Sequence, residues 1–322
     1  MPYRSSIYGL GVVANRIIPG VPASQTTADD VRIIFGSLPS WLDEASAAEI
    51  YVADYQDECG MPMLRVFRVL DDYYRFRYAD QTEFLIDREG AEIWARWPEP
   101  LTLEDAATYL LGPIMGFVML LRGVVCLHAS AIAIGDEAIA LVGPAGSGKS
   151  TTAAAFSDRG YSVLAEDVVT LDDRVDHFLI RPAYPCIRLW PASVKALYGT
   201  ETYLPKLTPN WDKCYLDLSE RFQRRPLPLA AIYLLDERRN DPGAPFIEPL
   251  DKSEGLMSLV ANTYATKLMD KQMRAREFEL LTRVLNNVPV QRVTPHSDIA
   301  HIPELCARIL SDIKSVLSAV NV

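Results

Sequence analysis

The sequence predicts an α/β protein with a smaller β-rich domain over residues 1–105 and a larger mixed domain over residues 106–322. Two observations support this prediction. Residues 63–98 contain four short runs of strand-forming residues separated by turn residues, and residues 138–160 have the pattern of a strand, a glycine-rich loop and a helix. At about 100–200 residues per domain, the length suits one large or two ordinary domains, and the boundary near residue 105 rests on the change of pattern alone.

The first hundred residues show mainly strand patterns. Residues 3–18 are rich in strand formers and end at Pro19-Gly20, and residues 63–98 predict an antiparallel meander. Residues 9–14 match G-x-G-x-x-A, but too little chain precedes them for a first strand and no helical pattern follows. We therefore interpret them as a strand that contains glycines. Residues 27–35 fit either a short helix or a strand.

A helix is expected after the meander. Thr102 can cap its N-terminus, with Asp105 at the position that completes a capping box, and Pro113 should kink it. The longest apolar run, Leu110–Leu121, is shorter than the ~20 residues that a transmembrane helix needs.

The composition and charge argue against several classes of protein. The net charge of −10 argues against general nucleic-acid binding. The five cysteines are scattered without C-x-x-C spacing, which favours a reducing compartment and gives no zinc or redox motif. The first residues lack the apolar segment of a signal peptide. We expect a cytoplasmic protein with no membrane or nucleic-acid partner, and leave a homo-oligomer open.

The most informative stretch is Gly143–Ser150, which fits G-x-x-x-x-G-K-[ST] at every fixed position. A predicted strand, Ala138–Val142, precedes it, and a predicted helix, Ser150–Arg159, follows with Gly160 as its C-cap. The glycines let backbone N–H groups approach phosphate oxygens, and the positive end of the helix points at the same anion. The sequence therefore predicts a nucleotide site.

We expect the phosphates of ATP to contact this loop and the start of the helix. Lys149 should reach the β- and γ-phosphates, and the Ser150 hydroxyl should bind Mg²⁺. The predicted nucleotide-binding residues are Gly143, Ala145, Gly146, Ser147, Gly148, Lys149, Ser150 and Thr151.

The chain before this loop is unusual. Residues 124–134 predict a strand, and Gly135-Asp136 fits a two-residue hairpin turn into the next strand. In the ordinary doubly wound nucleotide-binding fold the loop follows a parallel strand without such a hairpin, so a different P-loop fold is indicated.

Two acidic pairs compete for the reactive role. Glu166-Asp167 follows the predicted strand 161–165, and Asp236-Glu237 follows the apolar run 231–235. In either pair, one carboxylate can hold Mg²⁺. In the first pair the other carboxylate can accept a proton from an attacking hydroxyl, and in an ATPase Glu237 would orient water. The pattern alone does not separate the two pairs.

The spacing of several motifs resembles the HPr kinase/phosphorylase family. These motifs are His128-Ala-Ser, the hairpin, the Gly143–Ser150 loop, Arg159-Gly160-Tyr161 and Leu164–Val168. The resemblance covers residues 124–172 and is looser beyond them. It implies a P-loop fold like that of phosphoenolpyruvate carboxykinase and ATP-dependent phosphorylation of a serine hydroxyl, and it favours Glu166-Asp167.

The resemblance also implies roles for single residues. Glu166 falls on the catalytic aspartate of the family, which accepts the serine proton, and Asp167 falls on the second aspartate, which joins Ser150 at Mg²⁺. His128 falls on a histidine near that pair. Arg188 matches an arginine of a later family motif, whereas Cys186 stands where that motif has a metal-linked glutamate.

The acceptor and two alternatives stay open. The first hundred residues do not resemble those of the HPr enzyme, so HPr is not the expected substrate. Divergent kinases of this kind resemble those beside ribosomal-peptide clusters, such as lasso precursors. Cations that can balance charge are Arg188 and a basic region, namely Lys206, Lys213, Arg221, Arg224 and Arg225. The alternatives are an ATPase that uses Asp236-Glu237 and a non-catalytic nucleotide-binding module, which Cys186 favours.

Overall fold

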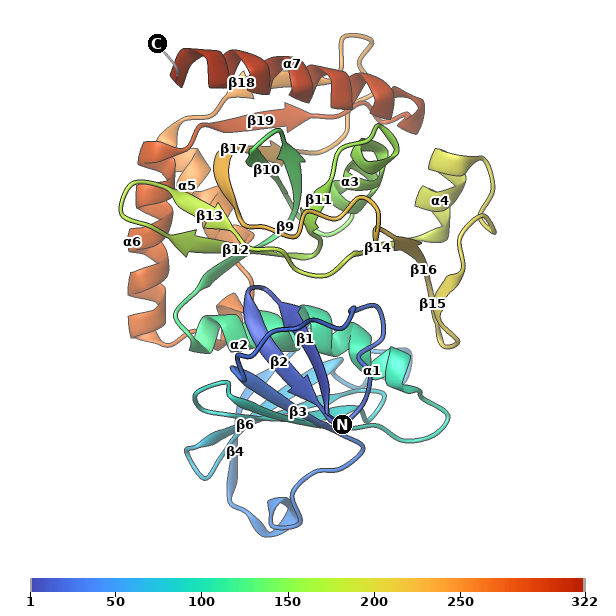
Figure 1. The fold of residues 1–322 in the computed structure, drawn as a ribbon, viewed down its shortest axis with the longest axis vertical. Helices are drawn as coiled ribbons and strands as arrows, with labels where there is room; N and C mark the ends of the chain where they lie inside the picture. The colour runs from blue at the N-terminus through green and yellow to red at the C-terminus, as the bar shows by residue number, and fades with distance from the viewer. Residues whose placement is uncertain (1, 321–322) are drawn as a thin grey trace. The chain divides into compact units, whose positions relative to one another are not determined.

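The computed structural model describes residues 2–320, and the chain divides into two compact units. Unit 1 comprises Met1–Val124 with the short segments Thr208–Trp211 and Ala265–Asp270, and unit 2 comprises the remainder. Figure 1 labels most of the helices and strands of both. The units separate between Val124 and Val125, whereas the sequence prediction places the boundary at about residue 105.

Unit 1 contains a mixed sheet of eight strands in the order β1-β2-β3-β8-β7-β6-β5-β4. The strands are β1 (Tyr3–Ile7), β2 (Leu10–Ala14), β3 (Val31–Phe35), β4 (Ala47–Val52), β5 (Leu64–Val69), β6 (Tyr73–Tyr78), β7 (Glu83–Asp87) and β8 (Glu92–Arg96), with a short 3₁₀ turn at Leu42–Glu44. The predicted meander is confirmed, because β5 to β8 pair antiparallel in sequence order. The ambiguous residues 27–35 end in strand β3, and Gly9 lies in the tight turn of the β1–β2 hairpin, as expected for a strand with glycines.

A bent helix packs on this sheet, which is why it belongs to unit 1. It consists of α1 (Leu103–Tyr109), a π-helical turn (Leu110–Ile114) that contains Pro113, and α2 (Met115–Leu121). The predicted capping box is present, because Thr102 N–H donates to Asp105 Oδ2 at 2.8 Å and Asp105 N–H donates to the Thr102 hydroxyl at 3.4 Å. The Phe117 ring lies 5.0 Å from the rings of both Tyr74 and Phe76.

The segment Leu103–Leu121 is also long and apolar enough to cross a membrane, judged by length and composition, among the residues that the structure describes. However, 83% of its apolar window is buried inside the protein. A core helix passes the same test.

Unit 2 is built around a second mixed sheet. Its strands are β9 (Val125–Ile134), β10 (Glu137–Val142), β11 (Val163–Ala165), β12 (Val168–Asp173), β13 (Phe178–Ile180), β17 (Leu227–Leu235), β18 (Phe246–Pro249) and β19 (Val290–Thr294). The predicted hairpin is confirmed, since β9 and β10 pair antiparallel around Gly135. Because β10 also pairs parallel with β17, the path β10-β9-β12-β13-β17 closes into a ring. This closure gives β10 two partners and fixes where its carboxyl end emerges.

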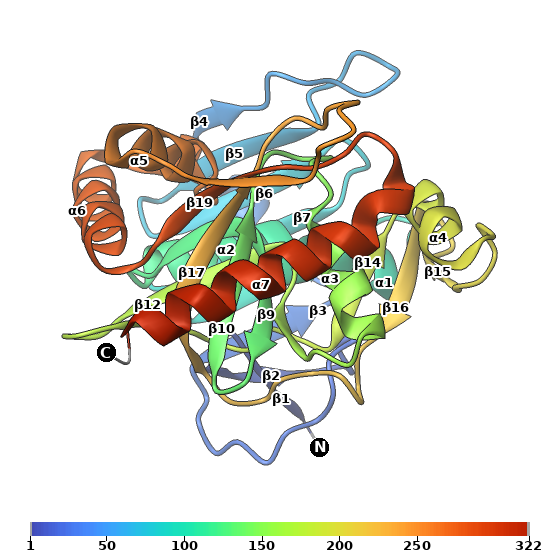
Figure 2. The ribbon, with the colours of Figure 1, turned by 90° about the horizontal axis from the view of Figure 1, so that it is seen from above.

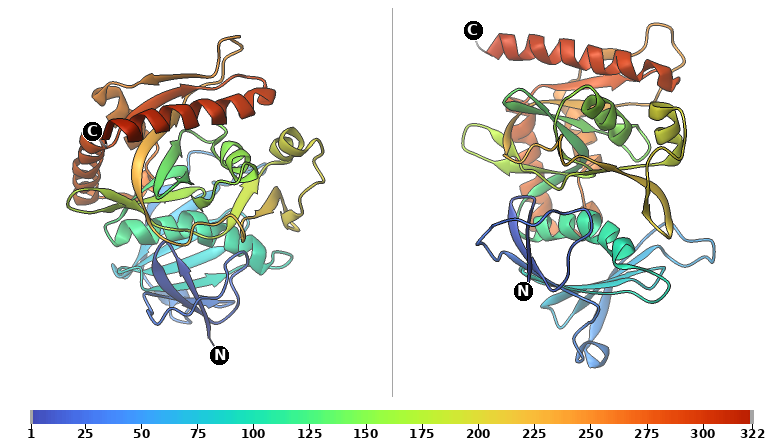
Figure 3. Two further views of the ribbon diagram at one scale, coloured as in Figure 1. Left: turned by 45° about the horizontal axis from the view of Figure 1, so that its top comes forward. Right: turned by 45° about the vertical axis from the view of Figure 1, so that its right-hand side comes forward.

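The other elements of unit 2 flank this sheet. A smaller sheet has the order β14 (Cys186–Leu189), β16 (Trp211–Asp217), β15 (Lys206–Thr208). The helices are α3 (Lys149–Asp158), α4 (Pro191–Tyr198), α5 (Lys252–Ala261), α6 (Lys271–Asn287) and α7 (Ile302–Val320). Helix α7 lies across β17 and α3, as Figures 2 and 3 show.

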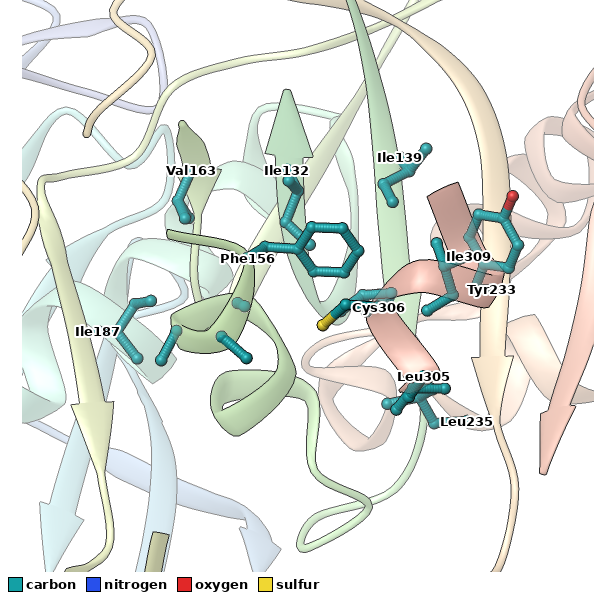
Figure 4. Packing of buried hydrophobic residues seen from close by; sticks show 14 of the residues in the cluster. Ile132, Ile139, Phe156, Val163, Ile187, Tyr233, Leu235, Leu305, Cys306 and Ile309 are labelled. Atoms are coloured by element: carbon teal, nitrogen blue, oxygen red, sulfur yellow. The ribbon is translucent and has the colours of Figure 1, made fainter. Parts of the chain in front are cut away.

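The core of unit 2 centres on Phe156 of α3, which is fully buried. In Figure 4 its ring points toward Ile132 of β9 and Cys306 of α7. The neighbouring Tyr233 of β17 is also fully buried, and its hydroxyl donates to Asp312 Oδ2 at 2.8 Å. These contacts hold α3, and with it the loop that precedes α3, against the sheet.

We expect Phe156→Ala to lower the free energy of unfolding of unit 2 by about 3–5 kcal/mol, because it removes a fully buried ring and leaves a cavity. The matched control Phe278→Ala, at a ring that is 55% exposed, should change stability by less than about 0.5 kcal/mol. Denaturant unfolding followed by circular dichroism measures both. Equal effects of the two substitutions would contradict this description of the core.

Candidate functional site

The loop Gly143–Ser150 joins β10 to α3 and has a backbone that requires glycine. Gly146 and Gly148 have φ angles of +81° and +105°, a region that other residues rarely adopt. A Cβ atom on Gly148 would also lie 2.9 Å from Nη2 of Arg238. The loop therefore depends on glycine at Gly148, a fixed position of the motif, and also at Gly146, a position that the motif leaves free.

Lys149 begins α3 and turns back over the loop. Its ammonium donates to the carbonyl oxygens of Gly143 at 2.7 Å and Pro144 at 2.9 Å, and the residue is 5% exposed. Burial lowers the pKa of Lys149 to about 8, although the nearby carboxylates of Asp167 and Glu166 oppose this shift. The loop thus holds a desolvated cation whose charged form an anion would stabilise.

Ser150 connects the loop to the acidic pair. Its hydroxyl donates to Glu166 Oε1 at 2.7 Å. Glu166 directly follows β11, whose pairing with β9 carries it toward the amino end of α3. Burial raises the pKa of the Glu166 carboxyl, and the positive charge of Arg188 acts against that shift.

Asp167 occupies a different environment from its neighbour. Its backbone has a φ of +72°, which costs free energy in a residue other than glycine. Its carboxylate accepts hydrogen bonds from Arg188 Nη2 at 2.8 Å and the Tyr264 hydroxyl at 3.3 Å, and His128 Nε2 lies 3.4 Å away. Burial alone would raise the pKa of Asp167, but the positive charge of Arg188, aided by Lys213, holds it below its usual value.

Arg188 of β14 bridges the two carboxylates. Besides its contact with Asp167, its Nε lies 3.5 Å from Glu166 Oε2, and its side chain is only 9% exposed. Two adjacent carboxylates that are largely removed from water repel each other, and one buried cation between them offsets this repulsion. Arg188, which the sequence offered as a cation that can balance charge, therefore lies at the acidic pair and contacts both carboxylates.

His128 of β9 faces Asp167 with an uncharged ring. Burial lowers the pKa of His128, although the charge of Asp167 opposes this. At neutral pH the imidazole is therefore neutral, and its Nε2–H can donate to Asp167 Oδ1. The contact orients a carboxylate without adding a full positive charge.

Two further residues neighbour the pair: Tyr264, which had no signal in the sequence, and Lys213. Tyr264 bonds to Asp167 across 97 residues of chain, and its ring meets His128 edge-on with centroids 6.1 Å apart. Its backbone N–H donates to Cys126 O at 2.8 Å, which anchors it beside β9. Lys213, one of five candidate cations in the sequence, is close enough to lower the pKa of Asp167 and Glu166 and packs on the Trp190 ring at 5.1 Å.

Arg224 and Arg225 form no contact with the acidic pair or the loop within residues 2–320. Both are exposed. The Cys186 thiol is buried, and burial raises its pKa, so it stays a neutral thiol. A neutral thiol does not replace a metal-binding glutamate.

The second acidic pair lies beyond the carboxyl end of β17, beside the strand that feeds the loop. Asp236 Oδ1 accepts from the Glu237 N–H at 2.8 Å, and Asp236 Oδ2 lies 3.8 Å from Arg292 Nε. Asp236 also lines a cavity of about 150 Å³ with Gly143 and Pro144. No contact joins it to Ser150 in the part of the chain that the structure describes.

The oxygen donors beside the loop suit one kind of metal. Within the described chain, no group of three or more His, Cys, Asp or Glu side chains could hold a metal ion by itself. Ser150 and Glu166 instead offer a hydroxyl and a carboxylate at hydrogen-bond distance. This set fits Mg²⁺, which binds through one or two protein oxygens together with phosphate oxygens and water.

Comparison with solved structures gives distant likenesses. No protein-family model matches the chain, and no curated protein matches it. A solved structure of the HPr(Ser) kinase/phosphatase from Coxiella burnetii is similar, with 14% sequence identity and a TM-score of 0.33, over 58% of this chain and 95% of that chain.

We expect Arg188→Gln to lower the free energy of unfolding at pH 7 by about 3 kcal/mol, because it leaves two carboxylates without their shared cation. The pKa of Asp167 lies below its unfolded value, so its pairing stabilises the fold above about pH 4, and this stabilisation is lost as the pH falls further. Arg174→Gln removes an exposed ion pair and serves as the control, with an effect below about 1 kcal/mol. Denaturant unfolding at pH 7 measures the loss of stability in both variants. Equal losses would contradict the bridging role of Arg188.

Proposed function

We propose that the chain is an ATP-dependent kinase that phosphorylates a serine hydroxyl of a peptide or protein. The observation that carries the proposal is the 2.7 Å hydrogen bond from Ser150 to Glu166, which joins the glycine loop to the acidic pair. Phosphoryl transfer needs a phosphate cradle, a metal site and a carboxylate beside the acceptor, and these parts adjoin in unit 2.

The fit of the loop to phosphate is supported by two side chains. The Lys149 ammonium is buried on loop carbonyls, and a phosphate oxygen would be a stronger acceptor for it. The Ser147 hydroxyl is buried and has no hydrogen-bond partner among the residues that the structure describes. A phosphate in the loop would satisfy this hydroxyl.

We assign Glu166 to the metal and Asp167 to the acceptor, which exchanges the roles that the family resemblance implies. Glu166 already contacts the hydroxyl expected to bind Mg²⁺. The Asp167 side chain is more exposed than that of Glu166 (21% against 6%), and His128 and Tyr264 contact it. Bound Mg²⁺ would neutralise charge on the phosphates.

In this scheme Asp167 hydrogen-bonds to the serine hydroxyl and accepts its proton as the serine oxygen bonds to the γ-phosphorus. The bond from that phosphorus to the bridging oxygen breaks, and ADP leaves. Lys149, and Lys213 in electrostatic range of the pair, balance the negative charge. Positioning of the two substrates and electrostatic stabilisation would supply most of the rate enhancement.

The acceptor class rests on the sequence resemblance. A ribosomal precursor peptide of the lasso type is the first candidate, and we include other serine peptides and small hydroxyl compounds as comparison substrates. Intact-mass analysis of each peptide after incubation with Mg²⁺ and ATP tests the proposal. A gain of one phosphoryl group that is lost with Lys149→Ala supports a kinase, and ADP release without any modified acceptor contradicts it.

An ATPase that uses Asp236 and Glu237 is a second candidate, because the parallel pairing of β10 and β17 puts Asp236 next to the loop strand. The pairing of Asp236 with Arg292 weighs against it. If the kinase proposal holds, Asp236→Asn changes ADP release much less than Asp167→Asn. The reverse order would support the ATPase.

Separate substitutions should distinguish the two carboxylates. We expect Glu166→Gln to raise the Mg²⁺ concentration needed for half-maximal transfer, because a metal ligand is lost. Asp167→Asn should leave that concentration unchanged and slow turnover by about 10²–10⁴-fold, as for a lost general base. Transfer rates over a Mg²⁺ titration measure both. If Asp167→Asn alone raises the Mg²⁺ requirement, the roles that the family resemblance implies are correct, with Asp167 at the metal and Glu166 at the acceptor.

Nucleotide affinity should fall as the pH rises above about 8, because Lys149 loses its charge near that pH in the free protein. Binding of the phosphates favours the charged ammonium, so binding at higher pH must take up a proton. Calorimetric titration with Mg²⁺ and ATP at pH 7 and pH 9 measures the change. Lys149→Met is the control, which should bind weakly with little pH dependence, and a wild-type affinity equal at both pH values would rule out this role for the lysine.

A further inference from the structure

A small hollow lies beside the glycine loop, and the proposed transfer mechanism does not use it. Gly148 and Thr151 line one side, and Arg238, His296, His301 and Ile302 line the other. Neither Ser150 nor Glu166 is among its described lining residues. Its enclosed volume of about 20 Å³ holds one water molecule, so a larger group would lie at its mouth.

The ring of His296 is fixed in one orientation and one tautomer. Its Nδ1 accepts a hydrogen bond from the Asp298 N–H at 2.8 Å, which leaves the ring proton of the neutral imidazole on Nε2. The His301 ring lies against it with centroids 3.9 Å apart and planes at 34°. The two rings thus pack against each other in a tilted arrangement, on the segment that follows β19.

Arg238 supplies an available cation next to this surface. Its side chain is exposed, and no ion pair or hydrogen bond engages its guanidinium within the described residues. Its Nη2 lies 2.9 Å from where a Cβ atom of Gly148 would be, so it sits directly on the loop. The neighbouring Arg239 donates its N–H to Pro295 O at 2.9 Å and accepts from Ser297 N–H at 2.9 Å, which ties the arginine segment to the histidine segment.

The position of the hollow along the loop indicates which part of a nucleotide would reach it. In loops of this sequence the lysine and the following serine serve the β- and γ-phosphates and the metal. The hollow borders Gly148 and Thr151 instead, and neither Lys149 nor Ser150 is among its described lining residues. The nucleoside end of a bound nucleotide would therefore leave the loop on this side.

We propose that His296 is the stacking platform for the base of the nucleotide and that Arg238 pairs with the phosphate chain beside Gly148. This inference rests on the proposed function, since it extends the same nucleotide site. A flat ring of fixed orientation suits base stacking, which tolerates different bases. An arginine on the loop suits a charge-assisted hydrogen bond to a phosphate oxygen.

Calorimetric titration of the full chain with ATP and with inorganic tripolyphosphate, both with Mg²⁺, separates the base from the phosphates. We expect His296→Ala to weaken ATP binding roughly 5- to 100-fold, as for a lost base stack, and to leave tripolyphosphate binding unchanged. His296→Phe should retain most of the ATP affinity because it keeps a flat ring. Arg238→Gln should weaken both ligands. His177→Ala, at an exposed histidine paired with Asp176, is the matched control and should change neither.

The outcomes separate this inference from the proposed function. Suppose that wild type binds both ligands. If His296→Ala then weakens the binding of neither ligand, or of both equally, the stacking role of His296 is wrong and the proposed nucleotide site is unaffected. If Arg238→Gln leaves tripolyphosphate binding unchanged, the phosphate role of Arg238 is wrong. If wild type binds neither ATP nor tripolyphosphate, the proposed function fails, and this inference fails with it.

Discussion

The hydrogen bond between Ser150 and Glu166 is the contact on which the site depends. It joins the start of α3, whose position is set by the packing of Phe156, to the end of β11, which pairs with β9. Because β9 and β17 both pair with β10, the sheet fixes the origin of the glycine loop as well. The buried core of unit 2 thus determines the distance between the loop and the acidic pair.

Adjacent residues acquire different chemistry from this arrangement. Glu166 is buried against the loop and its pKa rises, whereas Asp167 turns through a left-handed backbone toward Arg188, His128 and Tyr264 and its pKa falls. Desolvation acts on both carboxylates, but the cationic and donor groups around Asp167 outweigh it there. The geometry supports separate roles at a metal and at an acceptor hydroxyl, and it favours an assignment opposite to the one the sequence resemblance implies.

The sequence predicts local features well and distant contacts poorly. The hairpin around Gly135, the meander, the capping box of Thr102 and helix α3 are predictable because their signals lie within a few residues. The nearness of His128 to the acidic pair followed only from a family resemblance, and that of Arg188 was not predicted. Tyr264 and the Arg238–His296 region gave no signal, because strands and turns far apart in the chain bring them to the site. The helix after residue 102 packs on the first sheet through the ring of Phe117, which contacts Tyr74 and Phe76. The change of sequence pattern near residue 105 does not reveal this packing.

The central claim is that Ser150 and Glu166 act on the same bound metal. A double-mutant cycle of Ser150→Ala and Glu166→Gln, read as the gain in ATP affinity on adding Mg²⁺, tests it most directly. We expect the two substitutions to be strongly non-additive. Each single substitution should remove most of the gain in ATP affinity that Mg²⁺ gives, and the double variant should lose little more. Additive losses would mean that the two residues act independently and would contradict the claim.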